Sequence, residues 1–206
     1  MTTLLLGTAV DDVRVLAAGL DAELVELPIG ADDATLEAWR LDVGAGPAVD
    51  RLVVAVWVDD PAAGAVDDLD AASWEARAEA PIAAWVIGLG AAVSRCADGG
   101  TVIAVVERPA PLDCRGWAPE SAVSDAVEAL TRSLGRSEGP RRVRVNAVTT
   151  PARLTTGEVV QPPPPLATFP GTVEGDVVDA VRLLLDDGAG GLTGTVIHAD
   201  AGRSWR

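Results

Sequence analysis

The hydrophobic residues form short runs that are separated by longer stretches with helical spacing. The runs are rich in Val, Leu and Ile and nearly continuous, as is typical of strands covered on both faces of a parallel sheet. We predict six strands, at residues 3–7, 23–27, 51–58, 101–107, 143–148 and 195–200.

Three apolar patterns with helical periodicity lie between these runs, at residues 70–97, 123–134 and 177–185. The first predicts one long helix or two, with Pro81 in a first turn or at a kink. Alternating strands and helices imply right-handed crossovers, and so an α/β fold with a doubly wound parallel sheet and helices on both faces. No linker divides the chain, so we expect a single domain over residues 1–206.

Two segments depart from this alternation. Between the second and third strands the chain is too short for two crossovers and a strand. We interpret "RLDVG" (40–44) as the remnant of a strand, so that at least one helix is missing and the N-terminal half is truncated. The Pro-rich segment 161–173 predicts an extended surface loop, with a polyproline ligand as the alternative.

The charge of the chain limits its partners. The 206 residues carry a formal net charge of -15, and all 16 basic residues are Arg. Such an acidic protein repels phosphate backbones and anionic membranes, so we expect neither nucleic acid nor membrane as a partner. Without Lys, no side-chain amine is present to form a Schiff base or to lower the pKa of a neighbouring hydroxyl.

The cysteines and the first residues indicate the compartment. Cys96 and Cys114 form no CxxC pair, and a single His cannot complete a zinc site with them, so we predict reduced thiols and no metal. The first residues have no basic region and a short apolar run, unlike a signal peptide. No apolar stretch reaches the roughly 18 residues of a membrane span. We therefore predict a cytoplasmic protein.

Three segments of the second half carry a family resemblance. "LTRSL" (130–134), "VRVNAV" (143–148) and "LTGTVIHADAG" (192–202) occur in an order and at spacings that resemble the short-chain dehydrogenase/reductase family. The resemblance implies a Rossmann-like fold. It also implies hydride transfer between NAD(P) and an alcohol or ketone, carried out by a Tyr, a Lys, a Ser and an Asn.

The positions of those four residues hold other side chains here. The resemblance places the Tyr at Glu120, the Lys at Ser124, the Ser at Glu107 and the Asn near Pro81. The chain contains no Tyr and no Lys at all, so a small shift in alignment cannot restore them. We therefore predict that none of the family's catalytic residues is present.

The positions implied for cofactor binding are also changed. Gly7 matches the first glycine of the family's phosphate-binding turn, but the next two fall on or near Asp11 and Val13. Carboxylates there would repel a diphosphate by about 4 kcal/mol at a separation of ~4 Å. Trp57 stands where the family has a small residue beside the cofactor. We predict no cofactor, with NAD or NADP as the alternative.

Three functional hypotheses remain. The first is a non-catalytic homologue that acts as an oligomerising or partner subunit. The resemblance implies assembly through the helices near 70–97 and 120–137 and through the last strand and helix, either with itself or with an active homologous dehydrogenase subunit. The second is a divergent NAD(P)-dependent oxidoreductase that uses Glu107 or Glu120 as its acid/base. The third is a small-ligand binder that uses the former substrate cleft.

Overall fold

A computed structural model describes residues 2–59, 61–155 and 166–204. Its six strands form one parallel sheet in the order β2-β1-β3-β4-β5-β6. The strands are β1 Thr3–Gly7, β2 Ala22–Glu26, β3 Val49–Ala55, β4 Cys96–Glu107, β5 Arg144–Thr150 and β6 Val196–His198. This arrangement confirms the predicted α/β class and the six strands.

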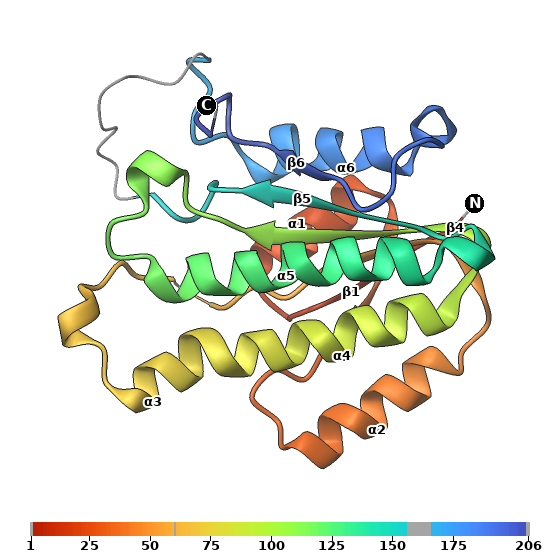
Figure 1. The fold of residues 1–206 in the computed structure, drawn as a ribbon, viewed down its shortest axis with the longest axis horizontal. Helices are drawn as coiled ribbons and strands as arrows, with labels where there is room; N and C mark the ends of the chain where they lie inside the picture. The colour runs from red at the N-terminus through yellow and green to blue at the C-terminus, as the bar shows by residue number, and fades with distance from the viewer. Residues whose placement is uncertain (1, 60, 156–165, 205–206) are drawn as a thin grey trace.

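Helices cover both faces of the sheet (Figure 1). On one face lie α2 (Asp33–Gly44), α4 (Ala80–Arg95) and α5 (Ala118–Ser137), whose apolar residues share a core with Leu4, Leu52 and Val102. On the other face, α1 (Asp11–Gly19) and α6 (Val178–Leu185) pack over Leu5 and Ile103. The sheet is buried on both sides, as its continuous apolar runs predict.

The predicted remnant strand at 40–44 is wrong, because those residues form the last turns of α2. The helix starts where the side chain of Asp32 accepts a hydrogen bond from the backbone N–H of Thr35. Leu36 and Val43, seven residues apart, both point into the core. One helix therefore joins β2 to β3 with no strand between them, and the N-terminal half is short for that reason.

The predicted long helix runs without interruption from Ala71 to Arg95. It comprises α3 (Ala71–Trp74), one π-helical turn (Glu75–Glu79) and α4. Pro81 has no N–H to donate, and the wider π turn directly before it accommodates that loss. Pro81 thus lies in the first turn of α4, as predicted, directly after the π turn.

The same helix meets the length and hydropathy of a membrane span, which corrects the prediction that no segment is long and apolar enough. Its mean hydropathy is 1.2 over 18 consecutive residues, and 44% of those residues are buried within the fold. The buried side faces the sheet between α2 and α5, and this packing accounts for its apolar residues. Cytoplasmic localisation stays a prediction.

The remaining segments agree in part with the sequence analysis. Residues 195–200 form only the short strand β6. In the Pro-rich segment, residues 161–165 lie outside the described residues, and 166–172 contain turns but no strand. Cys96 and Cys114 are both free, and burial raises the pKa of the Cys96 thiol to about 11.

Candidate functional site

The carboxyl ends of β1, β3, β4 and β5 meet at one edge of the sheet. The chain passes from β1 to β2 on one side and reaches β3 on the other, so the edge between β1 and β3 is a topological switch point. Ligands of doubly wound folds bind in the crevice outside such a point. The residues there are Gly7, Thr8 and Trp57, with Glu107 and Arg153 beside them.

Thr8 and Trp57 bridge this crevice. The Thr8 hydroxyl donates to the Trp57 carbonyl oxygen at 2.7 Å and accepts from the Trp57 backbone N–H at 3.0 Å. The indole N–H of Trp57 donates to the Val105 carbonyl oxygen at 2.8 Å. Trp57 is 1% exposed. Its ring is therefore part of the core.

Arg153 covers the crevice from the loop after β5. Its Nε lies 2.9 Å from an Asp12 carboxylate oxygen, and its Nη2 donates to the Val58 carbonyl oxygen at 2.8 Å. Its guanidinium carbon lies 5.6 Å from the centroid of the Trp57 ring, a cation–π distance. The Asp12 carboxylate, beside Asp11 at the start of α1, thus binds an internal cation.

Glu107 stands at the end of β4 under Arg153. The Arg153 Nη1 lies 3.3 Å from Glu107 Oε1, without the geometry of a hydrogen bond. Burial raises the pKa of Glu107 to about 8, which outweighs the opposing effect of Arg153; the charges of Asp12 and Glu120 raise it further. Glu107 therefore holds a proton at neutral pH that an ordinary carboxyl would have lost.

Glu120 is bound by a different arginine. Its two carboxylate oxygens accept hydrogen bonds of 2.8–2.9 Å from Nε and Nη2 of Arg77, in the π turn before α4. Glu107 and Glu120 line one cavity of about 20 Å³ together with Arg77 and Pro81. That volume has room for about one water molecule. The structure therefore places at one cavity the two acids that we predicted as alternative acid/base residues.

The other predicted site residues have structural roles. Ser124 is buried, and its hydroxyl donates to the Ser121 carbonyl oxygen within α5. Gly7 packs so closely that an added Cβ would lie 2.7 Å from the Ala55 carbonyl oxygen. Val13 is fully buried in the core. Asp11 is exposed at the start of α1 and pairs with Arg14.

Arg77 and Arg153 are the site residues that sequence reasoning missed. Neither belongs to a recognisable motif, and each meets its acid only through the tertiary fold, over sequence separations of 43 and 46 residues. The available signal was indirect: two acids, Glu107 and Glu120, at an edge predicted to be buried must each have a cation or a proton.

A larger cleft lies beside this cluster. Residues 63–66, after β3, and residues 112–118, after β4, enclose about 720 Å³. The segments that form this cleft follow β3 and β4, two of the strands whose ends carry the candidate site. Within the described part of the chain, no group of three or more His, Cys, Asp or Glu side chains could hold a metal ion.

The family comparison covers nearly the whole chain. A family model described as Enoyl-(Acyl carrier protein) reductase matches residues 5–204. No curated protein matches the chain.

Solved structures of short-chain dehydrogenases/reductases are similar in fold. A doubly substituted variant of such an enzyme from Serratia marcescens has a TM-score of 0.78 at 17% identity, covering 98% of each chain. A short-chain type dehydrogenase/reductase from Mycobacterium ulcerans has a TM-score of 0.74 at 19% identity, covering 100% of this chain and 90% of the other. A blue fluorescent protein from a metagenomic library, in complex with NADPH, has a TM-score of 0.69 at 18% identity, covering 98% of each chain.

These comparisons contradict the prediction of no cofactor. The family match and the NADPH complex indicate that this fold is one that binds a nicotinamide cofactor. At the switch point Thr8 and Trp57 are joined by two hydrogen bonds, and Arg153 binds Asp12 beside them.

Proposed function

The chain belongs to the short-chain dehydrogenase/reductase family, and from that premise we propose that it is a non-catalytic member that acts through association. The observation that carries this proposal is the fate of the family's acid/base positions. The chain has no Tyr and no Lys, Glu120 is bound by Arg77, and the Ser124 hydroxyl bonds within its own helix. These side chains serve the fold at the positions where the family performs its chemistry.

The surface proposed for association is formed by α4 and α5. The two helices lie side by side on one face of the sheet (Figure 1) and pack against each other. Val86 on α4 is 48% exposed. Two small residues are also exposed, Ala83 on α4 and Ala129 on α5. Small and apolar side chains on adjoining helices suit close packing against a second pair of helices. We propose a second copy of the chain as the partner.

Light scattering after gel filtration tests this proposal. The wild type should be a dimer or tetramer, and Val86→Arg should shift it to the monomer, because the added charge cannot be buried without a partner charge. Val15→Arg is the matched control, since Val15 is 39% exposed on α1 at the opposite face. A wild type that is monomeric would refute self-association; co-purification with an active homologous dehydrogenase would identify the hetero-oligomer instead.

The oxidoreductase hypothesis is the second candidate, and the state of Glu107 favours it. A carboxyl whose pKa is raised to about 8, beside a cavity with room for one water, has the properties of a general acid/base at neutral pH. NAD(P)H oxidation measured with a panel of carbonyl compounds tests it. Turnover that is lost in Glu107→Gln or Glu120→Gln would support this candidate and contradict the non-catalytic proposal.

A further inference from the structure

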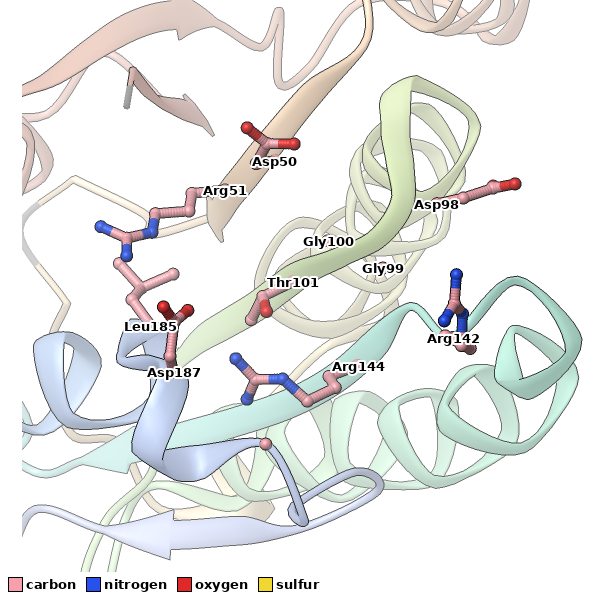
Figure 2. Close-up of a pocket in the computed structure, with 11 residues that line it drawn as sticks. Asp50, Arg51, Asp98, Gly99, Gly100, Thr101, Arg142, Arg144, Leu185 and Asp187 are labelled. Carbon is pink, nitrogen blue, oxygen red and sulfur yellow. The ribbon is translucent and has the colours of Figure 1, made fainter.

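A second pocket lies at the opposite edge of the sheet, where β3, β4 and β5 begin (Figure 2). Its volume is about 390 Å³, within the range of pockets that hold small molecules. The lining includes Arg51 from β3, Thr101 from β4, and Arg142 and Arg144 around the start of β5. No feature of the family resemblance places a ligand here.

Three arginines in one pocket are unusual in a chain of net charge -15. Arg144 is held in place, because its Nη1 donates to the carbonyl oxygens of Leu184 at 3.0 Å and Ala189 at 3.1 Å. These bonds leave its Nε and Nη2 for a ligand. Within residues 2–59, 61–155 and 166–204, Arg51 and Arg142 have no ion pair and no side-chain hydrogen bond.

The carboxylates of the pocket only partly offset these charges. Asp98 is paired with Arg141 at 2.9 Å, and Figure 2 shows its carboxylate directed away from Thr101. Asp187 lies toward Arg51 and Arg144 in the same view. Burial lowers the pKa of Arg144, the charge of Asp187 opposes that effect, and the charge of Arg51 adds to it. Arg51 and Arg144 are thus close enough to repel, and of the three carboxylates that line the pocket, Asp50 and Asp187 have no ion pair among the described residues.

We propose that this pocket binds a small anion that carries phosphate groups. An anion placed between Arg51 and Arg144 would relieve their repulsion, and guanidinium groups bind phosphate oxygens in pairs. The Thr101 side chain also lines the pocket and supplies a hydroxyl donor. The proposal does not depend on the function proposed above.

Calorimetric titration of the full chain with pyrophosphate, inorganic phosphate and citrate tests the proposal. Pyrophosphate should bind to the wild type more tightly than citrate. Arg51→Gln should weaken that binding about tenfold, because a charge-assisted hydrogen bond is lost. Asp187→Asn should strengthen it about threefold, because a nearby like charge is removed.

Arg136→Gln is the matched control, since it removes the same charge from the exposed surface of α5. Arg142→Gln gives a second exposed position in the pocket in case Arg51→Gln does not fold, and it should also weaken binding. Absence of pyrophosphate binding, preference for citrate, or equal losses in Arg51→Gln and Arg136→Gln would overturn the proposal. Weaker binding in Asp187→Asn would overturn it too, because a repelling carboxylate cannot help to hold an anion.

Discussion

The two edges of the sheet treat their charges in opposite ways. At the carboxyl edge, Arg153 is bound by Asp12 and lies over Trp57, and Arg77 is bound by Glu120. At the amino edge, Arg51 has no ion pair among the described residues, although it lines an open pocket. In a doubly wound fold the carboxyl edge is the place where a ligand is expected. Here the arginines at that edge are paired with the protein's own acids.

The difference shows how the charges at one edge of such a sheet can be neutralised within the fold. A buried charge is stable only with a partner, and a bound ligand is one kind of partner. Where internal acids meet the arginines, the fold no longer needs a ligand for that purpose. Arg51 and Arg142 have no ion pair among the described residues. The pocket at the amino edge is for this reason the better candidate for binding an anion.

The largest expected effect concerns Trp57. Trp57→Ala should lower the free energy of unfolding by about 4 kcal/mol, because it removes a fully buried ring and leaves a cavity. Urea denaturation followed by circular dichroism measures this loss. Trp74→Ala is the control, since Trp74 is 36% exposed and its loss should cost about 1 kcal/mol or less. Equal losses for the two variants would show that the carboxyl edge is not packed as described.

The next largest effect is a dependence of the free energy of unfolding on pH, which Glu107 causes. Its pKa is raised from 4.5 to about 8, so the folded protein binds the proton more tightly than the unfolded chain. The stabilisation is fully present below about pH 4.5 and is lost as pH rises toward 8. Between pH 5 and 8 this loss amounts to about 3 kcal/mol in the free energy of unfolding.

Glu107→Gln isolates that contribution, because the amide cannot titrate. Urea denaturation at pH 5, 6, 7 and 8 should give a difference between wild type and variant that changes steadily in favour of the variant as pH rises. Two parallel curves would mean that the pKa of Glu107 is not raised, as expected if Arg153 neutralises the carboxylate as a full ion pair.

The sequence predicted the sheet well because buried strands leave a direct signal. The runs at 3–7, 101–107 and 143–148 each match a strand to within a few residues. The weakest prediction was 40–44, where five residues cannot distinguish a strand from the end of a helix. The deciding feature, Asp32 as the N-cap of α2, lies eight residues earlier.

The candidate site was predictable only in part. The alignment to the family located Glu107 and Glu120, since their positions follow from local spacing along the chain. Arg77 and Arg153 depend on which loop meets which strand end, and a single sequence does not contain that information. The conclusion that no cofactor binds failed for a related reason: it took the loss of motif residues as the loss of the whole family property.

The smallest expected effect on stability concerns Gly99 and Gly100, two neighbouring glycines that line the open pocket. At Gly100 an added Cβ would lie 2.8 Å from the Asp50 carbonyl oxygen and 2.9 Å from that of Ala97, so the backbone of the pocket must move. Gly100→Ala should therefore cost about 2 kcal/mol in the free energy of unfolding. At Gly99 an added Cβ has no atom within 4 Å, and Gly99→Ala should cost only about 1 kcal/mol in the free energy of unfolding, because of a φ of +81°.

The two variants differ by one position and create the same methyl group, so urea denaturation of the pair separates steric contact from backbone strain. A larger loss for Gly99→Ala would mean that the strands begin differently at this edge, and the arginines would then not converge as we describe.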